Sequence, residues 1–131
     1  MRPDAETARA VKVGIDALFE ALKTNQLDAA HACFIPDADA VLLGSEDGEI
    51  AIGPQAIRLF LSSLLERPGP RFEMSEPVAL SASGDTAWFA GDAMVEVAEM
   101  RIPYRLAGVL VRRDHRWLWA LFSGSEPVPL R

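Results

Sequence analysis

The chain contains one cysteine, Cys33, among its 131 residues, so no disulfide can form within it. Such sparse cysteine use is typical of reducing compartments, and we expect a cytoplasmic location. No stretch approaches the ~20 consecutive apolar residues that a membrane span requires, so we expect no membrane partner. Residues 1–6 also lack the basic and then apolar order of a secretion signal.

Positive charge is also in short supply. The chain has 13 lysine and arginine residues against 19 aspartate and glutamate residues, which gives a formal net charge of −6. Nucleic-acid binding depends on a basic surface that neutralises phosphates, so we expect no nucleic-acid partner. Five of the basic residues fall between residues 101 and 116, where the solvent-exposed arms of a hairpin account for them.

The chain has only two histidines, His31 and His115. His31 falls in a short predicted helix and His115 in a predicted hairpin turn, so the two are not expected to meet. A metal site or a catalytic triad needs several such side chains brought together. We therefore expect neither a metal ion nor another cofactor, and we interpret both histidines as surface residues.

Half of the residues are hydrophobic, and the length of the chain fits a single domain that spans residues 1–131. Asp4 can cap a first helix of roughly twenty residues, which has one apolar stripe. The stripe consists of Val11, Ile15, Leu18 and Leu22. A second helix is predicted at 27–34, strands at 40–44 and 49–52, and a third helix from Pro54, because proline is favoured at the first helical position.

From residue 71 the hydrophobic period changes from 3.6 to 2, which is the period of a strand. We predict strands at 71–80, 86–98 and 104–112 and a last strand from Arg116, with a bend at 99–102 and with Pro77 at an edge or a bulge. Helices on one side of an antiparallel sheet define the α+β class, which we therefore predict.

The last predicted strand is apolar on both faces. If its side chains alternate regularly, one face carries Trp117, Trp119, Leu121 and Ser123, and the other carries Leu118, Ala120 and Phe122. Both faces must then be covered, and the helices can cover only one of them.

The order of these elements and several local sequences resemble the SnoaL-like proteins of the nuclear transport factor 2-like superfamily. The matching stretches are Leu27-Asp28-Ala29-Ala30 through Asp39, Gly53-Pro54-Gln55-Ala56-Ile57, Asp85-Thr86-Ala87-Trp88, Tyr104-Arg105-Leu106 and Arg116 through Pro127. The resemblance implies a cone-shaped, curved antiparallel sheet packed on three N-terminal helices, a cystatin-like α+β roll with a pocket on its concave side. Members of the superfamily include isomerases, cyclases, dehydratases and hydrolases, so the fold alone gives no activity.

Ketosteroid isomerase, an enzyme of similar shape, uses a carboxylate base together with acidic hydrogen-bond donors. The resemblance places its base at Leu42 and its tyrosine at Leu18 or Phe19 of this chain. These side chains cannot transfer a proton, and Tyr104, the only tyrosine, lies on a different element. We therefore predict no ketosteroid isomerase chemistry and assign no catalytic residue.

Three other polar positions could take part in chemistry. Many SnoaL-like relatives carry a histidine where this chain has Ser123, and a serine without a partner base is a poor nucleophile. Asp37 and Asp39 lie near the expected mouth of the pocket, where loop capping accounts for them. Either one could instead serve as a base if it turned inward with a perturbed pKa.

The strand face with Trp119, Leu121 and Ser123 would lie on the concave side of the resembling fold. We therefore predict a pocket whose apolar wall ends in a hydroxyl group. The predicted lining residues are Trp119, Leu121, Ser123, Arg105, Trp88, Leu42 and Phe19. Arg105 is also placed to pair with Asp92 or Glu96 on the neighbouring strand.

The uncovered side of the sheet would expose a larger apolar patch than a soluble monomer tolerates. We therefore predict a two-fold homodimer with sheet faces packed together, as the resemblance also implies. The leading hypothesis is a dimer whose conical pocket binds a small apolar or amphipathic molecule. The alternatives are a non-catalytic interaction module with a filled pocket, and an isomerase- or hydrolase-type enzyme that uses Asp37 or Asp39.

Overall fold

A computed structural model of the chain describes residues 1–75 and 79–130. The elements, in chain order, are α1 (Ala5–Lys23), α2 (Leu27–Ala32), β1 (Val41–Leu43), β2 (Ile50–Ile52), α3 (Pro54–Leu64), β3 (Arg71–Met74), β4 (Ala79–Ser83), β5 (Thr86–Val97), β6 (Met100–Arg113) and β7 (Arg116–Ser125). The elements up to α3 follow the predicted order, and the predicted α+β class is confirmed. The single strand predicted at 71–80 is instead two strands, β3 and β4, which pair with different parts of β5. Pro77, predicted at an edge or a bulge, and Val78, part of the strand predicted at 71–80, lie outside the described residues.

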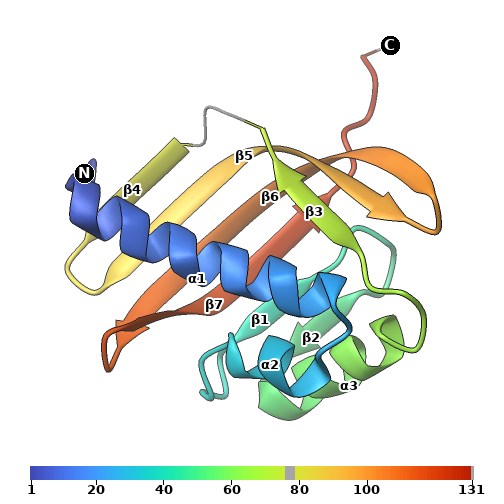
Figure 1. Cartoon of the computed structure of the whole chain (residues 1–131), viewed down its shortest axis with the longest axis horizontal. Coiled ribbons are helices and arrows are strands. Elements are labelled where there is room, and N and C mark those ends of the chain that lie inside the picture. Colours follow the sequence, from blue (N-terminus) through green and yellow to red (C-terminus); the bar gives the residue numbers. More distant parts are fainter. Residues whose placement is uncertain (76–78, 131) are drawn as a thin grey trace.

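The first helix begins where the sequence predicts. Asp4 is its N-cap, and an Asp4 carboxylate oxygen accepts a hydrogen bond of 2.7 Å from the backbone N–H of Thr7. This bond satisfies one of the N–H groups that a helix leaves free in its first turn. The predicted stripe is buried, from Val11 to Leu22, so α1 packs lengthwise on the sheet (Figure 1).

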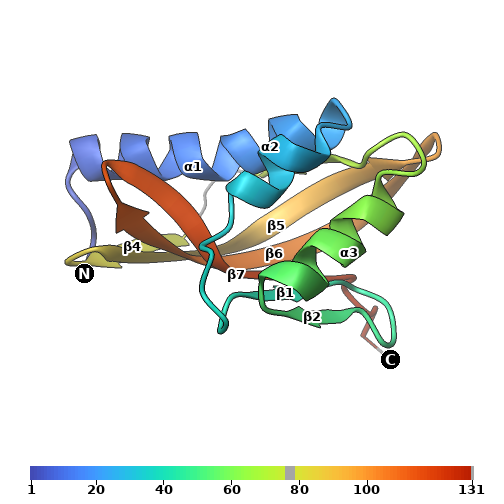
Figure 2. The same ribbon diagram turned by 90° about the horizontal axis from the view of Figure 1, so that it is seen from below.

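The strands form one curved sheet in the order β2-β1-β7-β6-β5-β3, with β4 paired to β5. All neighbouring pairs are antiparallel except β1 and β7, which are parallel. The sheet is therefore mixed rather than purely antiparallel as predicted, and side-chain alternation could not reveal this because it does not depend on strand direction. In Figure 2, α1 and α2 lie over the concave side of the sheet, and α3 flanks β1 and β2.

A bulge in β7 decides which side chains face the helices. Val109 of β6 pairs with Leu121, but the next residue, Leu110, pairs with Trp119, which leaves Ala120 as an extra residue. The alternation therefore shifts by one position, so that Trp119 and Phe122 both point into the core. The prediction that Trp119, Leu121 and Ser123 share a face is wrong, because an extra residue reverses all later side chains.

Aromatic rings fill the concave side around Trp119, which is 0% exposed. The ring of Trp119 lies 5.4 to 6.5 Å, centroid to centroid, from the rings of Phe19, Phe34, Phe89 and Phe122. Its indole N–H donates a 3.2 Å hydrogen bond to the carbonyl oxygen of Gly14. This bond joins α1 directly to β7, so the last strand lies at the centre of the core.

The β5–β6 and β6–β7 hairpins turn through residues with positive φ that are neither glycine nor asparagine. Ala98 and Glu99 both have positive φ values of 50° and 67°, and Asp114 and His115 have values of 49° and 68°. These values fit tight two-residue turns that match the twist of the flanking strands. The bend predicted at 99–102 is therefore misplaced: the turn is at Ala98 and Glu99, and β6 already begins at Met100. The sequence did not indicate this position, because the turn contains no glycine.

Asn25 joins the two helical regions. Its side-chain amide donates to the carbonyl oxygens of Leu65 and Arg67 at 3.0 and 2.8 Å, and its side-chain oxygen accepts from the N–H of Gly69 at 2.8 Å. These three bonds fix the turn after α1 against the loop that follows α3. The loop in turn forms one wall of the space between α1 and α3.

Candidate functional site

A cavity of about 320 Å³ opens between α1, α3 and the sheet. It lies beyond the aromatic residues that surround Trp119, towards the end of the cone formed by β1, the end of β5 and the start of β6. Most of its wall is apolar. The apolar lining residues are Leu18, Leu22, Phe34, Leu42, Phe60, Leu61, Leu64, Pro70, Phe72, Val95, Val97, Ile102 and Phe122.

Helix periodicity supplies two of these walls. Leu18 and Leu22 lie one turn apart on α1 and therefore point to the same side. Leu61 and Leu64 lie about one turn apart on α3 and also point into the cavity. The bulge in β7 turns Phe122 towards them. The cavity is thus built from side chains that converge from both helices and the sheet.

The inner end of the cavity is closed by aromatic side chains. The ring of Phe72 lies 5.9 Å from Phe122, 5.6 Å from Tyr104 and 5.5 Å from Phe19. The cone is therefore divided: the part around Trp119 is filled and the part beyond Phe122 is open. The volume around Trp119 is filled, as the alternative of a filled pocket predicts, and the open volume lies beyond Phe122.

The polar groups of the cavity lie together at one end. They belong to Tyr104 of β6, to Ser45, Glu46 and Glu49 of the β1–β2 connection, and to Glu126 after β7. The Ser45 hydroxyl donates to a Glu126 carboxylate oxygen at 3.2 Å, and the Glu46 N–H donates to Glu49 Oε1 at 2.9 Å. No lysine, arginine or histidine is among the lining residues that the structure describes.

Tyr104 carries the most buried of these polar groups, and it is 8% exposed. Its ring packs on Gly124, where a side chain would collide with the phenol. Burial raises the pKa of Tyr104, Ser45 lowers it by hydrogen bonding, and the negative charges of Glu49, Glu126 and Glu46 raise it further. The hydroxyl is therefore protonated at neutral pH and can donate a hydrogen bond to a ligand.

We expect the pKa of Tyr104 to lie above the ordinary value of a tyrosine, because burial disfavours the charged phenolate. Because Tyr104 is the only tyrosine in the chain, the ultraviolet absorbance of tyrosinate reports the ionisation of this group alone. Folding favours the neutral phenol, so its contribution to stability is fully present below the unfolded pKa. The contribution is lost as the pH rises through the folded pKa.

The measurement is a spectrophotometric titration of the folded chain and of the chain in denaturant. A folded midpoint above the denatured midpoint supports the burial of Tyr104 at the cavity. Equal midpoints, measured while circular dichroism still shows a folded chain, would contradict it.

The structure separates the predicted lining residues. Leu42 lies on the cavity wall. Trp119 lies in the filled core, and Phe19 packs between it and Phe72. The remaining four lie on the outer face of the sheet: Leu121, Ser123, Arg105 and Trp88. The bulge accounts for Leu121 and Ser123, and Arg105 lies 4.0 Å from Asp92 on that face, as the strand pattern predicts.

The two positions compared with ketosteroid isomerase do meet at the cavity. Leu18 and Leu42 both line it. Their side chains can contact an apolar ligand but cannot hold or move a proton. The single tyrosine instead enters the same cavity from β6.

The carboxylates predicted at the mouth lie elsewhere. Asp37 accepts two hydrogen bonds from the guanidinium of Arg113, at 2.5 and 2.6 Å. This hydrogen bonding lowers the pKa of Asp37, which makes the group a weaker base. Neither Asp37 nor Asp39 is among the residues that line the cavity.

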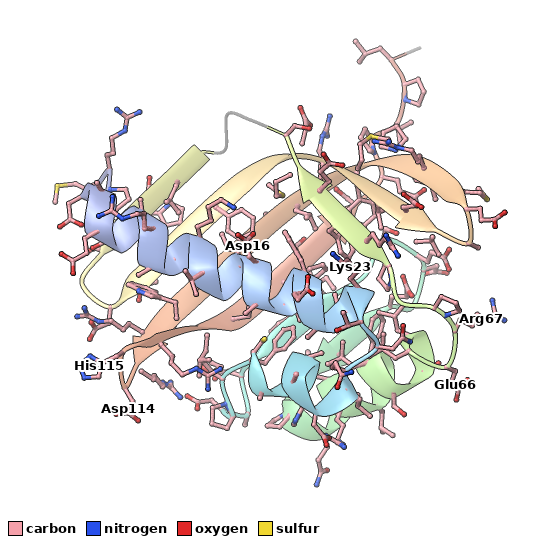
Figure 3. The ribbon with its side chains drawn as sticks, viewed as in Figure 1. Asp16, Lys23, Glu66, Arg67, Asp114 and His115 are labelled. Carbon is pink, nitrogen blue, oxygen red and sulfur yellow. The ribbon has the colours of Figure 1, made fainter. Side chains whose placement is uncertain are left out.

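Both histidines are also remote from it. His31 Nε2 lies 2.9 Å from the carbonyl oxygen of Pro54. His115 lies at the tip of the β6–β7 hairpin (Figure 3). Within residues 1–75 and 79–130, no group of three or more histidine, cysteine, aspartate or glutamate side chains is placed to hold a metal ion.

The sequence interpretation missed the polar end of the cavity. Tyr104 and Leu106 are two positions apart on β6, so the period-2 pattern places their side chains on the same face of the strand. Glu46 and Glu49 looked like ordinary turn residues, because nothing in their sequence shows that the turn lies beside Tyr104. Glu126 is brought there by the end of β7.

Comparison with known proteins supports the fold. A protein of the NTF2-like family from Streptomyces avermitilis, described as a candidate dehydratase, superposes with a TM-score of 0.87 at 13% sequence identity, over 97% of this chain and 100% of that chain. A candidate calcium/calmodulin-dependent protein kinase II association domain from Xanthomonas campestris superposes with a TM-score of 0.83 at 20% identity, over 99% and 94% of the two chains. A protein of unknown function with a cystatin-like fold from Nostoc punctiforme superposes with a TM-score of 0.79 at 18% sequence identity, over 99% of this chain and 98% of that chain.

These identities establish a shared architecture and do not transfer an activity. A comparison with curated protein sequences gives no significant match. In the structure described here, no helix is both long and apolar enough to cross a membrane. The sequence model of the SnoaL-like domain matches residues 11–129, and the chain therefore belongs to the family of SnoaL-like domains.

Proposed function

We propose that the chain binds a small apolar or amphipathic molecule in the cavity between α1, α3 and the sheet. The observation that carries this proposal is an open volume of about 320 Å³ with a wall of leucine, phenylalanine and valine side chains. Small-molecule sites are typically concave and mostly apolar, with a few polar groups that orient the ligand. Tyr104 and the nearby carboxylates are such polar groups.

Ligand binding is proposed here without an assigned reaction. Tyr104 can donate a hydrogen bond, and Glu46, Glu49 and Glu126 can accept a proton, so the cavity contains groups that can orient a ligand. The Streptomyces avermitilis relative is described as a candidate dehydratase, but no residue set here supports that reaction. Asp37 is held by Arg113 outside the cavity wall, so we do not propose it as a base.

The test is a variant that fills the cavity from α3. Leu64→Trp places a larger side chain on the cavity wall, and we expect it to weaken binding of the neutral fluorophore N-phenyl-1-naphthylamine by about tenfold or more, equivalent to 1.4 kcal/mol. The matched control is Leu59→Trp on the same helix, because Leu59 is 73% exposed and does not line the cavity. Binding is measured by fluorescence titration.

Retained affinity in Leu59→Trp together with loss in Leu64→Trp supports a ligand site in the cavity. If the fluorophore binds the wild type but the two variants bind it equally well, its site is elsewhere. Absence of binding to the wild type would also count against the proposal, and thermal unfolding of both variants verifies that each is folded.

We also propose that two copies of the chain associate through the outer face of the sheet. Apolar side chains from three neighbouring strands lie on this face, and Trp88 is 42% exposed there. The others are Met94, Ala107, Val109, Val111, Leu118 and Leu121. Two structures of the same fold, from Xanthomonas campestris and Thiobacillus denitrificans, are described as candidate association domains, which agrees with an assembling role.

Sedimentation velocity tests this second proposal. We expect a dimer at micromolar concentration and a monomer for Val109→Glu, because the introduced charge would be buried in the interface. The control Val13→Glu, at an exposed position of α1, should remain a dimer. A monomeric wild type at that concentration would rule out the association.

A further inference from the structure

We propose that the ligand of the cavity is an amphipathic cation, with an apolar body among the leucine and phenylalanine side chains and a protonated amine at the polar end. This inference rests on the proposed function and narrows it to a class of ligand. It depends on the sign of the charges that line the cavity and on how they are held.

All charged lining residues have the same sign. They are Glu46, Glu49 and Glu126. Among the described residues, the ion pairs of the chain involve other carboxylates, and none joins one of these three glutamates to a lysine or an arginine. The negative charge at this end of the cavity is therefore not balanced by a cation of the protein in the described part of the chain.

Neutral donors hold two of these carboxylates in place. The Glu46 N–H binds Oε1 of Glu49, whose side chain lies against Gly44, where an added Cβ would be 2.5 Å from that same oxygen. The Ser45 hydroxyl binds Oε2 of Glu126. These bonds fix the positions of the carboxylates without neutralising them, so the charges are partly preorganised for a ligand.

Tyr104 and the three glutamates line the same end of the cavity. The ring of Tyr104 is 8% exposed, and its pKa is raised first by burial and then by the negative charges of Glu49, Glu126 and Glu46. The negative potential of the glutamates therefore reaches a buried polar group inside the site. A ligand amine in that place would be attracted by the same potential, whereas a ligand carboxylate would be repelled.

Glu46 and Glu126 are exposed and Glu49 is half-buried, so the carboxylates lie at the solvent-facing end of the cavity. Salt screens their attraction for a cation there, and a hydrogen bond between an ammonium and a carboxylate is stronger than a neutral one. An uncharged ligand of the same shape would gain the burial of its apolar body but not the attraction at the polar end. The difference between the two ligands isolates the effect of the carboxylates.

The experiment uses three molecules with one skeleton: 4-phenylbutylamine, 4-phenylbutan-1-ol and 4-phenylbutanoate. Isothermal titration calorimetry at pH 7 and low salt should show that the amine binds at least about tenfold more tightly than the alcohol, as expected for a charge-assisted contact. The acid should bind most weakly. Raising the salt concentration should weaken binding of the amine and leave the affinity for the alcohol nearly unchanged.

Two variants locate the effect. Glu49→Gln preserves an oxygen that can accept the hydrogen bond from the Glu46 N–H. We expect this variant to weaken binding of the amine about threefold or more, because one interacting charge is removed. Its affinity for the alcohol should not change. Glu126→Gln gives a second, independent position at the same end. The matched control is Glu66→Gln, because Glu66 lies after α3 and does not line the cavity (Figure 3).

The three affinities distinguish the existence of a ligand site from its preference for a cation. If the alcohol binds and the amine binds no more tightly, or if the acid binds most tightly, the cationic preference is overturned while the ligand site remains. If none of the three molecules binds, both the site and its preference are overturned. A tighter amine that is weakened by Glu49→Gln or Glu126→Gln, but not by Glu66→Gln, supports the inference.

Discussion

Replacement of Trp119 by alanine is expected to lower the free energy of unfolding by about 3–5 kcal/mol, the cost typical of emptying a large core position. Trp119 is 0% exposed, and four phenylalanine rings lie within 6.5 Å of its ring centroid. The variant also loses the hydrogen bond from the indole N–H to the Gly14 carbonyl. A change of this size is a large part of the about 5–15 kcal/mol that usually stabilises a domain.

Chemical denaturation followed by circular dichroism measures this effect. Leu59→Ala on α3 is the control, because Leu59 is largely exposed and its truncation should change the free energy of unfolding by no more than about 0.5 kcal/mol. A loss below about 1 kcal/mol for Trp119→Ala would mean that the residue is not enclosed by the core described here.

The second large effect concerns the contact between α1 and β7. Gly14→Ala would ordinarily favour a helix, since alanine is better than glycine by about 1 kcal/mol. Here an added Cβ would lie 2.5 Å from the backbone carbonyl oxygen of Trp117 and 3.1 Å from a methyl carbon of Leu110. The helix must then move away from the sheet, so we expect a net loss of about 1–3 kcal/mol in the free energy of unfolding.

The sign of this change is the informative result. Val13→Ala, next to Gly14 on the exposed side of α1, serves as the control and should change the free energy of unfolding by at most about 0.5 kcal/mol. A stabilised Gly14→Ala protein would show that α1 does not lie this close to the last strand. Urea denaturation of the three proteins under the same conditions makes the comparison.

Patterns within one element predicted the elements well. The spacing of Val11, Ile15, Leu18 and Leu22 located α1 and its buried side, and Asp4 marked its beginning. The alternation in β5 and β6 located the two strands but did not show which face turns inward, and Trp88 and Arg105, predicted to line the pocket, lie on the outer face. These signals are local, because each depends only on the period of one helix or one strand.

The bulge at Ala120 was invisible for the same reason. Nothing in Trp119-Ala120-Leu121 distinguishes a bulged strand from a regular one, and the extra residue becomes evident only from the pairing with Val109 and Leu110. That single residue moved Leu121 and Ser123 to the outer face and turned Phe122 towards the cavity. One undetected residue therefore misplaced two of the predicted lining residues, Leu121 and Ser123.

The cavity itself depends on distant segments. Tyr104 and Glu49 are 55 positions apart in the sequence, and their proximity follows from the pairing of β1 with β7 and of β7 with β6. No local pattern contains this information. The filled core around Trp119 and the open volume beyond Phe122 likewise depend on how the aromatic side chains pack together.

The central claim is that the open part of the cone is a ligand site. A crystal structure of the protein with 4-phenylbutan-1-ol tests it most directly, because this neutral molecule depends only on the apolar wall. We predict electron density between Leu42, Leu64 and Phe122, with the ligand hydroxyl towards Tyr104. A cavity occupied by rearranged protein side chains, or ligand density only on the outer face of the sheet, would contradict the claim.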